Sequence, residues 1–274
     1  MISGAIKPSD RQAANGQAVV RLEGVHKRFG SLVVLDGIDL ELRGGETTVI
    51  LGESGSGKSV LLQHIVCLLR PDRGEVYFHD QRVDVLPERK LARIRPRFGF
   101  LFQLGALFDS MNAGDNVAFP LRTHTNLPER EIQKIVREKL AMVGLEEVTA
   151  KWPAQLSGGQ KKRVALARAI ALNPEVILYD EPTTGLDPPR ADEINELIVK
   201  LKRELSVTGA VVTHDMTSAQ KVADRIVMLH KGKFIFDGAW DTICHSDDPR
   251  ISSFVEGRCS DEVLQTIHSG TPSA

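Results

Sequence analysis

The chain has 274 residues, of which 42% are hydrophobic and 26% charged, and its formal net charge is −1. This composition is typical of a soluble globular protein that can bury a core, and it offers no global basic field, so no nucleic-acid partner is expected. Three scattered cysteines exclude a disulfide framework, and we find neither a secretion signal nor an apolar run long enough to span a bilayer.

The N-terminal region is expected to form a polar tail followed by a sheet. Residues 1–17 are polar and are predicted to be disordered. From Val19 to Leu42 short apolar and polar segments alternate, with glycine turns at Phe29-Gly30 and Asp36-Gly37, and residues 74–78 have the composition of a further strand. We expect these segments to form an antiparallel sheet beside the core of the protein.

A glycine-rich loop follows the apolar strand Thr47–Leu51 and precedes a helix that begins near Val60. Strand, G-x-x-x-x-G-K-[ST] loop and helix form the phosphate-binding motif of nucleoside triphosphate sites, because glycines let backbone N–H groups converge on phosphate oxygens beside a helix N-terminus. Lys58 is expected to reach the terminal phosphates and Ser59 to ligate Mg²⁺. The predicted binding residues of this loop are Gly52, Glu53, Ser54, Gly55, Ser56, Gly57, Lys58, Ser59 and Val60.

A second glycine-containing motif lies at the end of a helical region. From about residue 105 to 159 the pattern is helical, with apolar residues at helical spacing between Pro128 and Gly144. The sequence LSGGQ follows, in which Ser157 is a natural N-cap for a helix over 160–172. We interpret it as a second phosphate-binding helix terminus; the alternative is an ordinary capped helix with a glycine hinge. Its predicted binding residues are Ser157, Gly158, Gly159 and Gln160.

A continuous apolar strand, Val176–Tyr179, ends in two adjacent carboxylates. Ligands bind at the carboxyl edge of a parallel sheet. Asp180 is therefore expected to hold Mg²⁺ through its water shell, and Glu181 to orient and activate the attacking water.

The last third continues to alternate helices and strands. A helix, a strand, a helix and a hairpin are expected in turn over residues 188–205, 210–212, 216–223 and 225–237. Residues 239–274 carry apolar side chains too numerous to leave in water, so they are expected either to pack on their own subunit or to contact a partner. We interpret Lys161-Lys162-Arg163 as a solvated face or local contacts, and Cys67 as packed core.

With these motifs in this order, the chain resembles an ATP-binding cassette (ABC) ATPase over residues 19–238. The resemblance implies an α/β fold with a RecA-like P-loop core, an antiparallel β subdomain and a helical subdomain at about 105–160, all within an ATPase domain spanning 18–238. It implies ATP and Mg²⁺ as cofactors. It also implies that Gln103 senses the metal and contacts the membrane partner, and that His214 is the switch histidine that contacts the γ-phosphate.

The same resemblance implies a head-to-tail homodimer. Each ATP would lie between the glycine loop of one copy and Ser157-Gly158-Gly159 of the other, and its hydrolysis would weaken the closed state. Asp187, in Gly185-Leu186-Asp187, matches the loop that crosses the interface. Phe29 matches the aromatic that stacks on adenine, where Tyr is usual, so stacking is kept and a phenol contact is lost. The implied catalytic residues are Lys58, Gln103, Glu181 and His214, and the implied metal contacts are Ser59, Gln103 and Asp180.

A narrower resemblance, to the ATPases of Mla/Mce-type phospholipid transport systems, lies in residues 102–128 and continues in 248–257. It implies a cytoplasmic protein, peripheral on the cytoplasmic face of the inner membrane. The implied partners are integral membrane permease subunits, with lipid-binding Mce-type and accessory subunits, in a system that maintains outer-membrane lipid asymmetry.

Two alternatives to the phospholipid system stay open. Another ABC importer or exporter is possible because Phe-Gln and Asp-Asn-Val occur in many importers. A soluble ABC ATPase of iron–sulfur assembly is the other. Translation, chromosome and DNA-repair members would instead need a second cassette, a long coiled coil or zinc-binding cysteine pairs.

Overall fold

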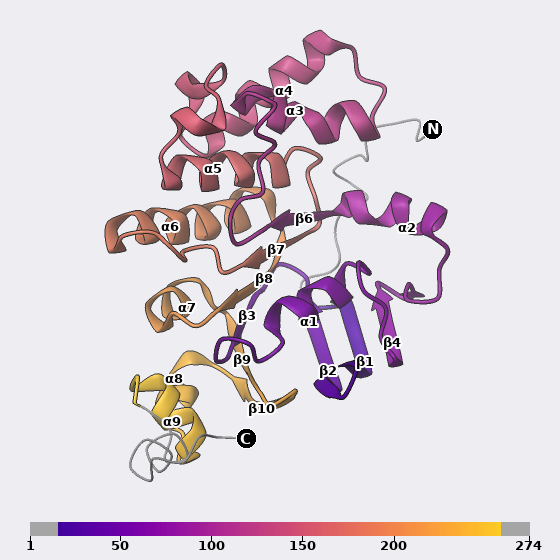
Figure 1. The fold of residues 1–274 in the computed structure, drawn as a ribbon, viewed down its shortest axis with the longest axis vertical. Helices are drawn as coiled ribbons and strands as arrows, with labels where there is room; N and C mark the ends of the chain where they lie inside the picture. The colour runs from indigo at the N-terminus through magenta and orange to yellow at the C-terminus, as the bar shows by residue number, and fades with distance from the viewer. Residues whose placement is uncertain (1–15, 259–274) are drawn as a thin grey trace.

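The computed structural model describes residues 16–258 (Figure 1). Its centre is a six-stranded sheet in the order β10-β9-β3-β8-β7-β6, in which β9, β3, β8, β7 and β6 run parallel and β10 pairs antiparallel with β9. The strands are β3 (Thr47–Leu51), β6 (Phe98–Leu101), β7 (Val176–Asp180), β8 (Thr208–Thr213), β9 (Arg225–His230) and β10 (Lys233–Gly238). Every residue of β3 and β8 is buried, as continuous apolar runs predict for parallel strands covered on both faces.

A second sheet is antiparallel and forms one side of the molecule (Figure 1). Its order is β2-β1-β4-β5, and its strands are β1 (Ala18–Phe29), β2 (Leu32–Arg43), β4 (Arg73–Phe78) and β5 (Gln81–Arg82). This is the antiparallel sheet expected from the alternating pattern of residues 19–42 and 74–78. The expected glycine turn at Asp36-Gly37 lies instead inside β2, which continues through it to Arg43.

Helices cover the two faces of the parallel sheet, and alternate strand residues divide between two hydrophobic clusters. On one face, Ile50 and Leu178 pack with α1, α2 and the antiparallel sheet. On the other, Val49 and Ile177 pack with helices from α3 onward. The helices of the first two thirds are α1 (Lys58–Ile65), α2 (Glu88–Ile94), α3 (Ala113–His124), α4 (Glu129–Met142) and α5 (Gly158–Ala169). Then follow α6 (Pro188–Leu205) and α7 (Met216–Val222), with short 3₁₀ turns η2 (Arg95–Arg97), η3 (Glu146–Val148) and η4 (Pro153–Gln155).

The helical region expected at 105–160 contains α3 and α4, and α5 begins at its end (Figure 1). Helix α4 occupies the interval between Pro128 and Gly144, whose positive φ of 67° allows the chain to turn out of the helix. The expected parts of the fold are therefore present: an α/β core, an antiparallel sheet and a helical part.

The C-terminal segment adds α8 (Trp240–Cys244) and α9 (Pro249–Val255). Ile243 and Ile251 are fully buried in the main core, and Trp240 and Phe254 pack against it. The described part of the extension therefore packs on its own subunit. The rest of it, with Val263, Leu264 and Ile267, lies outside the described residues, as do residues 1–15 of the expected N-terminal tail. Across residues 16–258 we find no helix with the length and hydropathy of a membrane span.

Candidate active site

The glycine loop connects the carboxyl end of β3 to the first turn of α1, and its backbone leaves no room for side chains at two positions. A Cβ atom at Gly52 would lie 2.8 Å from Ser56 Oγ and closer still to the Leu229 carbonyl. A Cβ atom at Gly57, where φ is 100°, would lie 2.9 Å from Val34. Glycine is thus required at both positions, and the loop keeps the compact course that a phosphate cradle needs.

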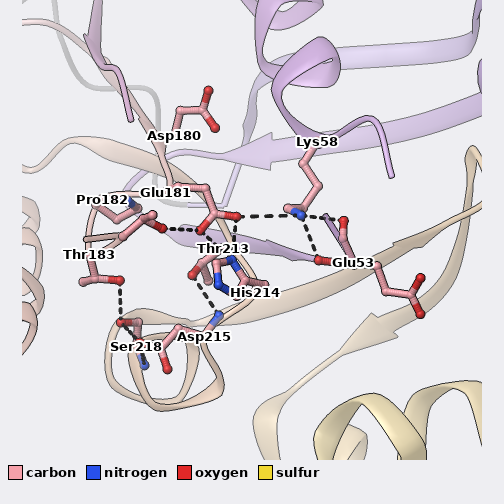
Figure 2. A network of polar contacts seen from close by, with 12 residues as sticks. Glu53, Lys58, Asp180, Glu181, Pro182, Thr183, Thr213, His214, Asp215 and Ser218 are labelled. Carbon is pink, nitrogen blue, oxygen red and sulfur yellow. Dashed lines mark hydrogen bonds and ion pairs between the residues drawn. The ribbon is translucent and has the colours of Figure 1, made fainter. Parts of the chain in front are cut away.

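Lys58 is the buried cation of this loop. Its side chain is 5% exposed, and Nζ donates to the carbonyls of Gly52 and Glu53 at 2.8 Å each. Nζ also lies 3.7 Å from Glu181 Oε1 (Figure 2). Burial lowers the pKa of Lys58, and the nearby carboxylates of Glu181 and Asp180 oppose that shift. The ammonium is therefore held over the loop, facing the carboxyl edge of the sheet.

Two oxygen groups lie side by side next to this lysine. Ser59 Oγ donates to Asp180 Oδ1 at 2.9 Å, and burial raises the pKa of Asp180 while the Ser59 bond opposes that rise. A hydroxyl and a carboxylate are ligand types that Mg²⁺ prefers, so this pair fits the expected metal. Ser56 Oγ is buried and has no hydrogen-bond partner within residues 16–258, which leaves it available to a bound phosphate.

Glu181 stands at the centre of the cluster, with 8% of the residue exposed (Figure 2). Its carboxylate accepts a hydrogen bond from Thr184 Oγ1 at 3.1 Å and lies 2.9 Å from His214 Nδ1. Its backbone φ is 48°, an uncommon conformation outside glycine that is held by the bond from Glu181 N to the Val212 carbonyl. A carboxylate fixed between a lysine and a histidine can accept a proton from a water molecule placed beside it.

A polar network holds the loop that carries His214 (Figure 2). Asp215 caps α7 and accepts a hydrogen bond from Ser218 Oγ at 2.5 Å. Ser218 Oγ in turn accepts from Asn195 Nδ2 at 2.9 Å and lies 3.3 Å from Thr183 Oγ1. These hydrogen bonds therefore connect the segments after β7 and β8 behind the Glu181–His214 pair.

An open cleft adjoins this network. It has a volume of about 370 Å³ and is lined by residues of the segments after β7 and β8, of α6 and of α7, including Thr184, Asp192, Asn195, His214 and Thr217. His214 thus borders the cleft on one side and Glu181 on the other.

The LSGGQ motif forms a separate terminus at the start of α5. Ser157 Oγ accepts from Gln160 N at 3.2 Å, and Gln160 Oε1 accepts from Ser157 N at 3.0 Å, which is a complete capping box. Ser157 and Gly158 are exposed, and the Cβ position of Gly158 lies 3.7 Å from Leu186. This exposed terminus therefore lies beside the Gly185-Leu186-Asp187 loop of its own chain, where Asp187 caps α6.

Two further predicted residues lie at the edges of the site. Phe29, at the end of β1, is 48% exposed, and Lys27 Nζ lies 5.6 Å from its ring centre. Gln103 is exposed in the loop after β6. One chain thus brings Lys58, Ser59, Asp180, Glu181 and His214 into a single cluster, while Ser157–Gln160 form their own surface.

Sequence reasoning did not connect Lys162 with this cluster, and of the two environments expected for it the solvated face is wrong. Lys162 was expected on a solvated face or in local contacts, yet it is 5% exposed and donates to the carbonyls of Glu181 and Pro182. The signal was its spacing, since Lys162 follows buried Gly159 by three residues and shares its face of α5. Three consecutive basic residues hid that pattern.

Comparison with known proteins agrees with this architecture. The family model described as ABC transporter matches residues 35–184. The intermembrane phospholipid transport system ATP-binding protein MlaF of Haemophilus influenzae is 41% identical over 241 residues, which cover 88% of this chain and 91% of that protein. MlaF of Escherichia coli K12 is 40% identical over 87% of this chain and 89% of that protein. The "Probable ribonucleotide transport ATP-binding protein mkl" of Mycobacterium tuberculosis is 42% identical, with 87% and 67% covered.

Solved structures give the same answer. The dimeric, post-hydrolysis ATP-binding cassette MJ0796 bound to ADP and Pi is 38% identical, covers 80% of this chain and 98% of that chain, and superposes with a TM-score of 0.75. CbiO1 of Clostridium perfringens, part of the ABC transporter complex cbiONQ, is 29% identical. The match covers 92% of this chain and 99% of that chain, with a TM-score of 0.77. The chain therefore belongs to the ABC transporter family, as an ATP-binding subunit with ATPase activity.

Proposed function

We propose that this chain is the ATP-hydrolysing subunit of a phospholipid transport system, working as a head-to-tail homodimer beneath integral membrane permease subunits on the cytoplasmic face of the inner membrane. The observation that carries the hydrolytic part is the convergence of Lys58, Asp180, Glu181 and His214 at one sheet edge. The phospholipid cargo rests on the two MlaF relatives, which match over about nine tenths of both chains.

In this proposal the glycine loop holds the phosphates of ATP. Backbone N–H groups of residues 52–60 surround them, Lys58 neutralises the terminal phosphates, and Phe29 stacks on adenine. Ser59, Asp180 and Gln103 would hold Mg²⁺, which supplies charge neutralisation at the phosphates when bound. The adjacent hydroxyl and carboxylate of Ser59 and Asp180 support this assignment.

Glu181 is proposed as the base that accepts the proton of the attacking water. Thr184 and His214 hold its carboxylate in place, and His214 is half exposed toward the cleft, where a γ-phosphate can reach it.

The second half of each site is proposed to come from the other copy. Ser157, Gly158, Gly159 and Gln160 would meet the phosphates bound to the partner, with Asp187 crossing the interface. Two observations support this arrangement. The capped terminus of α5 is solvent-exposed in one chain, and the similar cassette MJ0796 is dimeric with ADP and Pi bound.

An exposed aromatic surface supports a permease partner. Leu104 is 89% exposed, and Phe102 and Phe108, in the same segment between β6 and α3, and Phe119, on α3 itself, are each about two fifths exposed. The Phe108 and Phe119 rings touch, with centroids 4.7 Å apart. Apolar surface gathered in this way marks a protein contact, and we assign it to the permease. Mce-type and accessory subunits would join through that permease.

A second candidate comes from the mycobacterial mkl protein, which is named for probable ribonucleotide transport and is 42% identical to this chain. The two cargoes can be separated in a complex reconstituted with the co-purified permease. Stimulation of ATP hydrolysis by phospholipid vesicles supports the first proposal, whereas stimulation by ribonucleotides supports the second. Purification without any permease would favour a soluble ABC ATPase instead.

A cellular experiment tests the cargo independently. We expect deletion of the gene to make the outer membrane permeable to detergent, and the wild-type chain, but not a Glu181→Gln variant, to restore the barrier. An intact barrier after deletion would remove the phospholipid proposal.

A further inference from the structure

Lys162 connects the helix of the LSGGQ motif to the main chain that carries Glu181. It lies one turn into α5, with a side chain that is 5% exposed. Its Nζ donates to the carbonyl of Glu181 at 3.2 Å and to that of Pro182 at 2.6 Å. A buried ammonium with two backbone acceptors costs desolvation that a neutral side chain of α5 would avoid. Such a cost needs a compensating role.

The two carbonyls belong to the strained turn on which the Glu181 carboxylate stands. Glu181 has a φ of 48°, and its N–H is bonded to Val212 of β8. Lys162 bonds the same turn from α5. A turn in this conformation persists where its surroundings over-determine it. Lys162 therefore helps to fix the main chain from which the carboxylate projects, while Thr184 and His214 contact the carboxylate itself.

Helix α5 begins one turn before Lys162, at the exposed terminus of Ser157 and Gly158. Because an α-helix moves as a rigid element, a shift of this terminus is transmitted over one helical turn to Lys162, and from there to Glu181 of the same chain. In a head-to-tail dimer the terminus meets the nucleotide bound by the partner, whereas Glu181 acts on the nucleotide bound by its own chain.

We propose that Lys162 is a positioning residue that couples nucleotide occupancy at one site of the dimer to the orientation of Glu181 at the other. This inference rests on the proposed role of Glu181 and on the proposed head-to-tail dimer. Within each copy, the two hydrogen bonds of Lys162 connect the helix terminus that meets the partner's nucleotide to the main chain of Glu181, which acts on the copy's own nucleotide. Lys162 does not itself touch the reacting atoms.

The test compares three variants of the full chain. Lys162→Met removes both bonds at similar side-chain length, and Lys162→Gln restores a neutral donor. Lys200→Met is the matched control, because Lys200 Nζ also donates to a backbone carbonyl, that of Met142 at 2.9 Å, and joins α6 to the end of α4 away from the cluster. Steady-state ATPase rates, affinity for a fluorescent ATP analogue and thermal midpoints are measured for each.

We expect Lys162→Met to lower kcat about tenfold or more while ATP affinity stays within about twofold, and to remove cooperativity in ATP concentration. Lys162→Gln should recover part of the kcat and part of the cooperativity that Lys162→Met loses. Lys200→Met should lower the thermal midpoint by a similar amount and leave kcat and cooperativity unchanged. Equal kcat in the Lys162→Met and Lys200→Met variants, or a loss of ATP affinity parallel to the loss of kcat, overturns the inference. If Lys162→Met does not fold, a further variant, Lys162→Arg, is compared with Lys162→Gln. Equal kcat and equal cooperativity in these two variants then overturn the inference.

A Glu181→Gln background separates this inference from the function on which it rests. Adding Lys162→Met there should lower the residual rate no further, because groups that act as a unit are not additive. Near-normal turnover of Glu181→Gln alone contradicts the proposed function. An inactive Glu181→Gln together with a fully active Lys162→Met contradicts the coupling alone.

Discussion

His214 Nδ1 lies 2.9 Å from Glu181 Oε2, although 33 residues separate them in the chain. The two residues follow neighbouring strands, β7 and β8, which pair in parallel register with Asp180 opposite Val212. The contact is therefore fixed by the sheet, and the histidine is half exposed while the carboxylate is buried. We propose Glu181 as the base that activates the attacking water, so a substitution of this carboxylate tests the role of the pair.

Glu181→Gln is expected to abolish steady-state hydrolysis and to keep ATP binding. The amide preserves the size and shape of the side chain but cannot accept a proton from water, and loss of a general base costs ~10²–10⁴-fold in rate. The variant should accumulate as an ATP-bound dimer, measured by gel filtration with and without ATP. Glu204→Gln, an exposed glutamate on α6, is the control. Near-normal turnover of Glu181→Gln would show that another group activates the water.

The two proposed phosphate-binding helix termini should respond differently to substitution. Lys58→Ala is expected to weaken ATP binding by the monomer, because it removes the buried cation that we propose contacts phosphate in the ground state. Ser157→Arg should leave that binding intact and prevent the ATP-bound dimer, since it places a large charged side chain on the exposed terminus of α5. Calorimetric ATP affinity and dimerisation are measured side by side.

Ser157→Ala controls for the loss of the cap alone. Removal of the Ser157–Gln160 bond costs about 1 kcal/mol of stability and adds no bulk. We expect this variant to dimerise. If Lys58→Ala and Ser157→Arg lose ATP affinity equally, the proposal that each site is shared between two copies is wrong.

Sequence patterns predict most of the fold because its core follows two simple rules. Buried parallel strands appear as continuous apolar runs, as at 47–51 and 176–179, and α4 lies between its expected start at Pro128 and stop at Gly144. Cys67 was expected in the core and is buried there, where burial raises the pKa of its thiol to about 12. These features depend on local pattern and not on distant contacts.

The residues that sequence reasoning missed are polar groups whose partners lie far away in the chain. Asn195 on α6 and Ser218 on α7 meet behind the site across 23 positions of sequence. Lys162 donates to the carbonyls of Glu181 and Pro182, which lie about 20 positions further along the chain. No periodicity identifies such pairs, because a single polar residue on an apolar face looks like an interruption of the pattern. They become visible when the two elements are placed together.

The lowered pKa of Lys162 predicts that the stability of the folded chain depends on pH. Burial lowers its pKa from 10.5 to about 8 in the folded chain. Between these values the unfolded chain binds more protons than the folded one, so the free energy of unfolding contributed by this group rises from about pH 8 to pH 10.5. We expect Lys162→Met to lose part of that rise, measured by urea unfolding at several pH values. Lys200→Met should keep it. An identical pH dependence in the wild type and Lys162→Met would show that Lys162 titrates normally.

The exposed surface around Leu104 should be needed for assembly and not for chemistry. Leu104→Glu places a charge on a side chain that is 89% exposed, so the stability of the isolated chain and its ATP affinity should be unchanged. Co-purification with the permease should fall. Val85→Glu, at an apolar residue 58% exposed in the segment between β5 and α2, is the control. Equal recovery of the permease with both variants would place the contact elsewhere.

The C-terminal extension is expected to divide into a structural part and a dispensable part. Ile251 is 2% exposed and packs in the main core, so Ile251→Ala should cost about 2–5 kcal/mol of stability, as deletion of buried methyl groups does. Truncation after Gly257 keeps α8 and α9 and should leave stability and ATP binding unchanged, whereas truncation after Gly238 removes both helices and should destabilise the chain. Urea unfolding and ATP affinity are measured for all three. Complex recovery with the permease then assigns the remaining residues: reduced recovery of the Gly257 truncation indicates that they contact a partner, and full recovery indicates that they do not.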